Sequence, residues 1–226
     1  MALPLAGVNV LDLTNIMAGP YCTMVLGDMG AEVVKVENFP EGDASRRFDP
    51  KVNDESYCFA VLNRNKKSLA LDMKHPRGKE IFRQLAAKAD IITENFRPGV
   101  IRKLGIDYDS VRQFNPGVVY ASMSGFGQTG PYGRKGGYDE IMRDAHIKAR
   151  HMVVDMDHPV IGPMKTLGMP IKSTGELTAI RKPAPWLGQH SAEVLRSLGC
   201  DSADIDALFS EGVVYDKFRD QARDPA

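Results

Sequence analysis

Basic residues recur near the ends of the apolar segments of the chain, where they could hold an anionic ligand. They are Arg64, Lys66, Lys67, Lys74, Arg97, Arg102 and Lys103. Any single surface lysine is ordinarily only a solvated charge, but together these positions suit a phosphorylated ligand. Each charge-assisted hydrogen bond to a phosphate would contribute about 1.5–3 kcal/mol. Asn95 and Phe96 add an amide and an aromatic face that suit an adenine, although Phe96 fits a hydrophobic core equally well.

Two other patterns could carry chemistry, but both fit poorly. The glycines of 125–130 have the G-x-G-x-x-G spacing of dinucleotide sites, yet Pro131 and more glycines follow where that fingerprint requires a helix. Potential metal ligands gather further on, at His146, His151, Asp155, Asp157 and His158. Their spacing matches no known metal site and equally suits a solvated strand face. We therefore expect no metal and no tightly bound cofactor.

The overall charge excludes one large class of function. Among 226 residues, 29 Lys and Arg balance 29 Asp and Glu, so the basic excess of a nucleic-acid binder is missing. Three scattered cysteines, at positions 22, 58 and 200, form no C-x-x-C pair and indicate reduced thiols. The first residues lack the basic segment of a signal peptide, and no apolar run is long enough to span a membrane. We expect a soluble cytoplasmic protein with no membrane partner.

Strands and helices alternate through the first part of the chain. Short apolar runs predict strands at 8–14, 31–37, 67–72, 89–96 and 117–124, and helices are expected at 21–30, 75–89 and 98–104. The polar stretch 38–57 indicates a binding loop. This order predicts an α/β fold with a Rossmann-like, doubly wound, mainly parallel sheet. Ligands of such sheets bind at the carboxyl ends of the strands.

The character of the sequence changes after residue 137. We expect a helix at 140–150, short antiparallel strands within 151–175, and helices near 191–198 and 202–210. Ser191 and the pair Asp201-Ser202 are the predicted N-caps of the last two helices. The predicted organisation is a Rossmann-like domain over 1–139 and a C-terminal α+β segment over 140–226 that packs on it.

Several sequence blocks together resemble the class III CoA-transferases, a family that includes formyl-CoA and carnitine CoA-transferases and is related to α-methylacyl-CoA racemase. The blocks are LAGVNVLDLTNIMAGPYCTMVLGDMGAEVVKVENFPEGD, FAVLNRNKKSLALDMK, ADIITENFRPGVIRKLGIDY, NPGVVYASMSGFGQTGP and GGYD. The resemblance runs almost without a gap over 5–139, and the tail resembles the same family's C-terminal segment. It implies acyl-CoA and a carboxylic acid as substrates.

The resemblance also assigns CoA contacts. They fall on Asn15, Ile16, Met17, Ala18, Leu71, Lys74, Asn95, Phe96 and Lys103. In this assignment Lys74 and Lys103 would hold phosphates, Leu71 and Phe96 would bracket the adenine, and the backbone of 15–18 would accompany the pantetheine arm. Asn15 replaces a frequent histidine, and Asn38 stands where an arginine can bind the nucleotide. Tyr138 stands where the racemases carry a histidine, which favours a transferase.

The catalytic nucleophile of the family has no counterpart in this sequence. In the family a Gly-rich region and a helix with the nucleophilic aspartate follow the GYD block, whereas here Asp139 runs straight into Glu140. Asp139, Asp144, Asp155 and Asp157 are nearby, but none matches the motif, so the catalytic residue stays unknown. We expect the chain to bind CoA and to be inactive or severely impaired in transfer. The alternative is a non-catalytic CoA-binding module, or one part of a split transferase. Family members form interlocked homodimers, and whether this chain also dimerises stays open.

Overall fold

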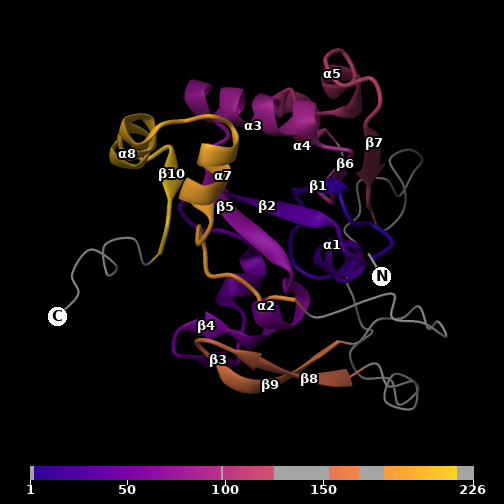
Figure 1. The fold of residues 1–226 in the computed structure, drawn as a ribbon, viewed down its shortest axis with the longest axis vertical. Coiled ribbons are helices and arrows are strands. Elements are labelled where there is room, and N and C mark those ends of the chain that lie inside the picture. The colour runs from indigo at the N-terminus through magenta and orange to yellow at the C-terminus, as the bar shows by residue number, and fades with distance from the viewer. Residues whose placement is uncertain (1–2, 98, 125–152, 168–180, 218–226) are drawn as a thin grey trace.

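The computed structural model describes residues 3–97, 99–124, 153–167 and 181–217. Six strands form the central sheet in the order β10-β5-β2-β1-β6-β7 (Figure 1). The parallel strands are β1 (Asn9–Asp12), β2 (Glu32–Asn38), β5 (Lys66–Leu71), β6 (Ile91–Glu94) and β7 (Val119–Ser122). The edge strand β10 (Val214–Tyr215) runs antiparallel to β5. The expected α/β class with a mainly parallel sheet is confirmed.

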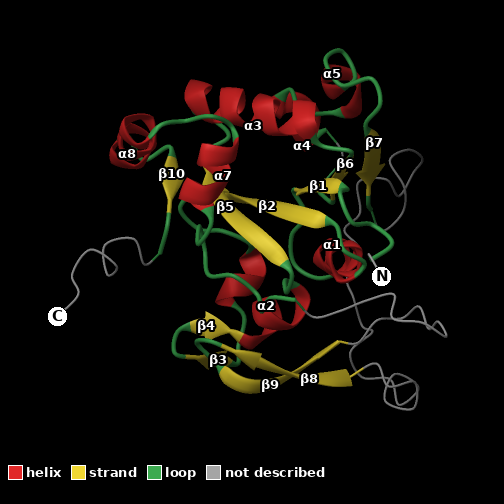
Figure 2. Cartoon of the chain, in the orientation of Figure 1, coloured by secondary structure: helices red, strands yellow, loops and turns green. Residues whose placement is uncertain are grey.

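Helices lie on both faces of this sheet. They are α1 (Ala18–Asp28), α2 (Tyr57–Leu62), α3 (Pro76–Lys88), α4 (Val100–Leu104), α5 (Tyr108–Val111), α7 (Ser191–Ser197) and α8 (Ser202–Ser210). Figure 2 shows α3, α4 and α8 on one side of the sheet and α1 and α2 on the other. Neighbouring residues of a strand point to opposite faces. Accordingly Leu11 belongs to the core cluster that includes α3, α7 and α8, whereas Val10 packs with residues of α1 and β2.

The helix α3 follows the sequence expectation closely. His75 is its N-cap and accepts a hydrogen bond from the backbone N–H of Arg77 at 3.2 Å, and Pro76 occupies the first position. Its apolar stripe, Ile81, Phe82, Leu85 and Ala86, is buried against the sheet. Removing a large apolar side chain from water contributes about 1.5–3 kcal/mol, so this stripe fixes the orientation of the helix.

The stretch expected as one loop, 38–57, contains more structure than its polarity suggests. It holds the 3₁₀ turn η1 (Ala44–Arg47) and the small hairpin of β3 (Lys51–Val52) and β4 (Glu55–Ser56), and it leads directly into α2. A second antiparallel hairpin, β8 (Val153–His158) with β9 (Gly162–Leu167), lies within the region expected to form such strands. The two hairpins and α2 lie together on the α1 side of the sheet (Figure 1).

The C-terminal helices correct one of the two predicted caps. Asp201 accepts a hydrogen bond from the N–H of Asp204 at 2.8 Å, as an N-cap should. For α7, however, the N-cap is His190, because Ser191 already belongs to the helix and its hydroxyl donates to the carbonyl of Tyr215. No sequence pattern indicated β10. The expected helix at 140–150 lies outside the described residues, and none of the helices inside them combines the length and hydrophobicity needed to cross a bilayer.

Candidate functional site

The order of the strands places a switch point between β1 and β6. From β1 the chain moves to β2 and β5 on one side, and then returns to β6 and β7 on the other. The chain therefore leaves the carboxyl ends of β1 and β6 in opposite directions, and open α/β sheets ordinarily bind their ligands at such a point. The loops that follow these two strands carry residues 15–18 and 95–96. Six of the nine predicted CoA contacts therefore belong to these two loops.

The two loops are joined by a single side chain. The amide oxygen of Asn95 accepts from the backbone N–H of Asn15 at 2.7 Å, and its amide nitrogen donates to the carbonyl of Asn15 at 2.8 Å. Asn95 thus mimics a neighbouring strand and ties the β1 loop to the β6 loop. Both polar atoms of the Asn95 amide are used in this contact, so the side chain holds the two loops together.

The remaining polar groups of the β1 loop are also held by side chains. Asp12 accepts from the N–H of Thr14 at 2.8 Å, Lys35 donates to the carbonyl of Thr14 at 2.6 Å, and Asp43 accepts from the N–H of Ile16 at 3.0 Å. Five consecutive backbone groups, from the N–H of Thr14 to the N–H of Ile16, therefore have side-chain partners. Of the backbone expected to accompany a pantetheine arm, both groups of Asn15 and the N–H of Ile16 are therefore already bonded within the protein.

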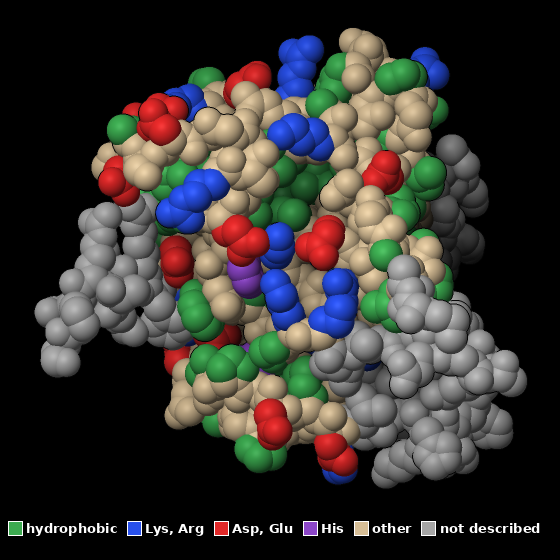
Figure 3. Space-filling model, in the orientation of Figure 1, with side chains coloured by type: hydrophobic (Ala, Val, Ile, Leu, Met, Phe, Trp, Pro, Cys, Tyr) green, Lys and Arg blue, Asp and Glu red, His purple; other side chains and the backbone are tan. Residues whose placement is uncertain are grey.

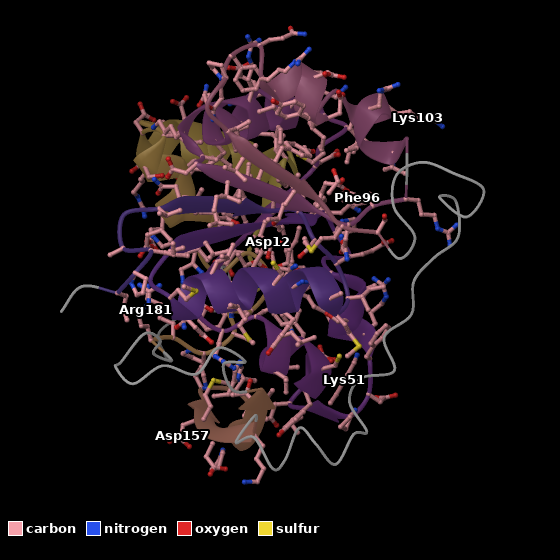
Figure 4. All side chains as sticks on the ribbon, turned by 90° about the vertical axis from the view of Figure 1, so that its right-hand side faces the viewer. Asp12, Lys51, Phe96, Lys103, Asp157 and Arg181 are labelled. Carbon is pink, nitrogen blue, oxygen red and sulfur yellow. The ribbon has the colours of Figure 1, made fainter. Side chains whose placement is uncertain are left out.

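The three charged side chains that hold this loop form a buried cluster. Lys35 lies 2.9 Å from Asp43 and 4.0 Å from Asp12, and none of the three side chains is exposed. Burial alone would raise the pKa of Asp43, but Lys35 and the N–H groups of Ser45 and Ile16 lower it to about 2. Burial likewise opposes the charge on Lys35, yet Asp12 and Asp43 raise the pKa of its amine. All three groups are therefore charged at neutral pH, in the interior between the sheet and α1 (Asp12 in Figure 4).

The loop after β6 and the helix α4 that follows it carry Phe96 and Lys103 of the predicted site. The N–H of Phe96 donates to Glu94 at 2.8 Å, and the half-buried ring packs against the main core. Lys103 is exposed in the last turn of α4. Figure 4 shows Phe96 and Lys103 on the same side of the molecule, opposite Arg181, which binds the carbonyls of Gly27 and Ala31 before β2.

The predicted contacts after β5 lie farther away. Leu71 is 0% exposed and packs in the main core, so its side chain offers no surface to a ligand. The sheet also places β5 three strand spacings from β6, about 14 Å. Leu71 and Phe96 therefore do not bracket one adenine ring, which corrects that expectation. Lys74 is exposed just beyond β5, where only a long ligand could reach both it and the β6 loop.

Three of the predicted basic residues do not belong to an anion site. Arg64 and Lys66 are each 1% exposed and pair with Asp28 at 2.6 Å and Asp12 at 3.0 Å. Lys67 pairs with acids on β2 and α7. All three lie at the amino end of β5 or before it, so the polar pattern there reflected buried ion pairs. Lys74, Arg97, Arg102 and Lys103 are exposed after the carboxyl ends of their strands.

The main hollow on the opposite edge of the sheet lacks features of a ligand site. A pocket of 240 Å³ lies between α3 and α7 at the amino ends of β1 and β2, with a hydrophobic floor and charged side chains around it (Figure 3). Lys67 on its rim is already paired with Glu32 at 3.6 Å and Glu193 at 2.7 Å. Lys88, which also lines the pocket, donates to the carbonyl of Ser197 at 3.1 Å, so these charged side chains already have partners within the protein.

The metal and dinucleotide patterns gain no support from the described residues. Asp155 and Asp157 are exposed. Both ring nitrogens of the buried His158 have backbone partners: Nε2 contacts the carbonyl of Ala184, and Nδ1 accepts from the N–H groups of Val160 and Ile161. Within the described ranges, no three potential ligands lie close enough to hold an ion. His146, His151, the glycines of 125–130, Tyr138, Asp139 and Asp144 lie outside the described residues.

Comparison with known proteins supplies the family. The sequence model of CoA-transferase family III matches residues 5–145 and 139–191 of this chain. These ranges include both loops of the switch point. The chain belongs to CoA-transferase family III. It is 48% identical over 139 residues to a mouse (Mus musculus) succinyl-CoA:glutarate CoA-transferase, a match that covers 61% of this chain and 32% of the relative.

Two further family III relatives differ in their named substrates. An acetyl-CoA:oxalate CoA-transferase of Acetobacter aceti is 43% identical over 62% of this chain and 36% of its own length. The alpha subunit of a succinyl-CoA–L-malate CoA-transferase of Chloroflexus aurantiacus is 37% identical over 87% of this chain and 42% of its own length. The family III chain described here therefore matches only about a third to two fifths of these proteins.

Solved structures agree with the family assignment. A CAIB/BAIF family protein from Brucella suis aligns with a TM-score of 0.58 at 28% identity, covering 99% of this chain and 57% of that one. A hypothetical protein from Mycobacterium tuberculosis aligns with a TM-score of 0.56 at 38% identity, covering 73% of this chain and 44% of that one. The mixed α/β fold of this family III chain thus has experimentally determined counterparts.

Sequence reasoning missed the charged residues that build this family III site. Lys35 and Asp43 were not singled out, although Lys35 alternates with valines in a buried strand. A strand of a parallel sheet is usually apolar on both faces. Lysine and glutamate at alternate positions of the segment VVKVEN were therefore the available signal for a buried ionic layer.

Proposed function

We propose that this chain binds the CoA part of an acyl-CoA thioester at the switch point and serves the transfer of CoA to a carboxylic acid. The observation that carries the proposal is the coincidence of two findings. The family match spans residues 5–145, and within it the loops of Asn15 and Asn95 are hydrogen-bonded to each other at the carboxyl edge of β1 and β6.

The exposed side chains at this edge suit such a ligand. Ile16 and the half-buried Phe96 offer apolar contacts for pantetheine and for one face of the adenine, while Lys103 offers a charge for a phosphate. Lys74 supplies a second charge to a ligand long enough to run along the edge toward β5. An exposed cation contributes about 1 kcal/mol at most, because solvent screens it.

The transfer reaction needs a carboxylate that attacks the thioester carbonyl. Attack gives a mixed anhydride and releases CoA thiolate, which then attacks the enzyme carbonyl of the anhydride, expels the donor acid and leaves an enzyme thioester. The acceptor carboxylate attacks this thioester to form a second anhydride, and the released thiolate attacks its acyl carbon, which gives the acceptor thioester and restores the enzyme carboxylate. We propose no nucleophile in this chain, because no aspartate matches the family motif. This favours a second candidate function, a CoA-binding part of a transferase whose nucleophile comes from another chain. Under either function no further cofactor is required, since the thioester energy is conserved.

The proposed organisation follows from the same assignment. Residues 1–139 would form a Rossmann-like, doubly wound CoA-binding domain, and 140–226 a C-terminal segment packed on it. The pairing of β10 with β5 and the position of α7 over β5 support that packing. We propose a cytoplasmic protein, consistent with three free cysteines, and a homodimer, which light scattering of the purified chain would test.

Binding of CoA to the whole chain tests the proposal. Titration calorimetry should show saturable binding, and Lys74→Ala and Lys103→Ala should each raise the Kd about fivefold, the equivalent of ~1 kcal/mol. Lys88→Ala is the matched control, since Lys88 lines the pocket at the opposite edge. Absence of binding at millimolar CoA would refute the proposal, and equal effects of all three variants would refute the site.

A trapping experiment separates the two candidate functions. The chain is incubated with an acyl-CoA and hydroxylamine, and its intact mass is measured. Without a nucleophile we expect no adduct. A modified aspartate would show that this chain carries its own nucleophile and would identify it.

A further inference from the structure

Ile16 adopts a backbone conformation that its side chain disfavours. Its φ is +73°, in the left-handed region where a β-branched residue is strongly disfavoured. Its side chain is nevertheless 42% exposed, so packing of that side chain does not account for the conformation. Strained residues of this kind persist only where the surroundings hold them, and they concentrate at functional sites. Contacts to the backbone must therefore hold Ile16.

The carboxylate of Asp43 binds the backbone of Ile16 directly. Its Oδ1 accepts from the N–H of Ile16 at 3.0 Å, and also from the N–H and hydroxyl of Ser45 at 2.9 and 2.8 Å. Its Oδ2 pairs with Lys35 at 2.9 Å, and Lys35 in turn donates to the carbonyl of Thr14. One carboxylate thus links the turn after β2 to both ends of the β1 loop. Asp43 itself is 1% exposed and cannot contact a ligand.

We propose that Asp43 is a positioning residue for the CoA thioester: it holds Ile16 in the left-handed conformation and so fixes the surface that the loop Thr14–Met17 presents at the switch point. This inference rests on the proposed function. It assigns the ligand-facing part of the loop to the side chain of Ile16, because the backbone groups that precede this side chain, from the N–H of Thr14 to the N–H of Ile16, are bonded within the protein. The ligand class that fits an exposed branched alkyl group here is the pantetheine arm or the acyl chain of a thioester.

Two substitutions of Asp43 separate positioning from simple ion pairing. Asp43→Asn and Asp43→Ala both remove the negative charge opposite Lys35, but only Asp43→Ala also removes the acceptor for the N–H of Ile16. A purely electrostatic role predicts the same CoA affinity for both variants. Positioning predicts partial rescue by asparagine, with the Kd for CoA rising about threefold in Asp43→Asn and at least about tenfold in Asp43→Ala.

A matched control removes the effect of a weakened fold. Asp28 is also buried and pairs with Arg64 at 2.6 Å, and its described contacts are with Arg64 and Asn65 rather than the β1 loop. Asp28→Asn should lower the melting temperature and leave the Kd for CoA within about twofold of the wild type. If it weakens binding as much as Asp43→Asn, general destabilisation explains the result and the inference is wrong.

A background substitution keeps the test decisive if Asp43→Ala does not fold. Glycine adopts a φ of +73° without strain. In the Ile16→Gly background, Asp43→Asn should therefore raise the Kd by a smaller factor than it does in the wild type. Equal factors in the two backgrounds would overturn the inference.

Hydrogen exchange of the free protein distinguishes failure of the inference from failure of the proposed function. The amide of Ile16 should exchange about tenfold faster or more in Asp43→Ala than in the wild type, with Asp43→Asn between them. If the wild type does not bind CoA, the proposed function falls and takes the ligand assignment with it, while exchange still decides whether Asp43 holds the loop. Unchanged exchange at Ile16 would refute that. Faster exchange with an unchanged Kd for CoA would refute the link to binding.

Discussion

Substituting Asp43 should change how the stability of the protein depends on pH. Asp43→Asn keeps the shape of the side chain and removes its titration. Burial tends to raise the pKa of Asp43, but Lys35 and the N–H groups of Ser45 and Ile16 outweigh it, so the folded pKa is about 2, against 3.8 for an ordinary aspartate. The unfolded chain therefore takes up a proton at a higher pH than the folded one.

The pKa shift sets the size of the effect. The difference between the folded and unfolded pKa of Asp43 corresponds to about 2 kcal/mol of unfolding free energy. Because the folded pKa is depressed, this contribution is complete above about pH 5 and is lost as the pH falls toward 2. The wild type should therefore exceed Asp43→Asn in stability by about 2 kcal/mol more at pH 7 than at pH 2.

Urea unfolding followed by circular dichroism, at several pH values from 7 down to the lowest at which both proteins fold, measures this difference. Asp155→Asn controls for the substitution itself: Asp155 is 84% exposed in its pair with Lys165, so we expect less than about 0.5 kcal/mol at any pH. A stability difference between the wild type and Asp43→Asn that stays constant from pH 7 to pH 3 would refute the assigned ion pair.

Two further substitutions test a close backbone contact beside β10 and the buried ion pair of Glu37. Gly188→Ala should lower the free energy of unfolding, measured by thermal unfolding, by at least about 3 kcal/mol, because the new Cβ would lie 1.9 Å from the carbonyl oxygen of Tyr215 at a φ of +75°. Gly105→Ala is the control: its Cβ meets nothing within 4 Å, so it should cost only the strain of its positive φ, about 1–2 kcal/mol. Equal losses would contradict the close approach. Arg46→Met should cost about 3–5 kcal/mol in urea unfolding, because Glu37 would lose a two-point bond of 2.7 Å per contact and remain buried and charged. Adding Glu37→Gln should restore part of that loss, and no restoration would show that the two residues act independently.

The elements of the sheet were predictable where a local pattern decides them. The apolar stripe of α3 and the short buried runs of β1, β2, β5 and β6 are visible in the sequence because burial on a helix or strand imposes a period. β10 was not predictable, since two residues carry no period and their pairing with β5 joins positions more than 140 apart in the chain. The cap of α7 was misplaced by one residue because Ser191 bonds to a distant carbonyl instead.

The site was only partly predictable for a related reason. The resemblance found the loops of Asn15 and Asn95, but not the side chains that give the β1 loop its shape. Asp43 lies 27 residues from Ile16, in a stretch whose polarity suggested a binding loop and not a buried ion pair. Arg64 and Lys66 were counted as candidates for anion binding because they are basic and lie near the end of an apolar segment. A single sequence does not show that such charges are paired inside the protein.

The two faces of the sheet contribute differently to stability and to the site. The face toward α3 and α7 buries Leu11, Leu69 and Ile92, whereas the face toward α1 buries Asp12, Lys35 and other charged groups. Buried ion pairs are often no more stabilising than apolar residues of the same size, so stability alone does not explain a charged layer. Each of these two charges bonds to the β1 loop at Thr14. We therefore infer that the charged layer positions the loop, and that substitutions in it reduce ligand affinity at temperatures where the apolar face still keeps the protein folded.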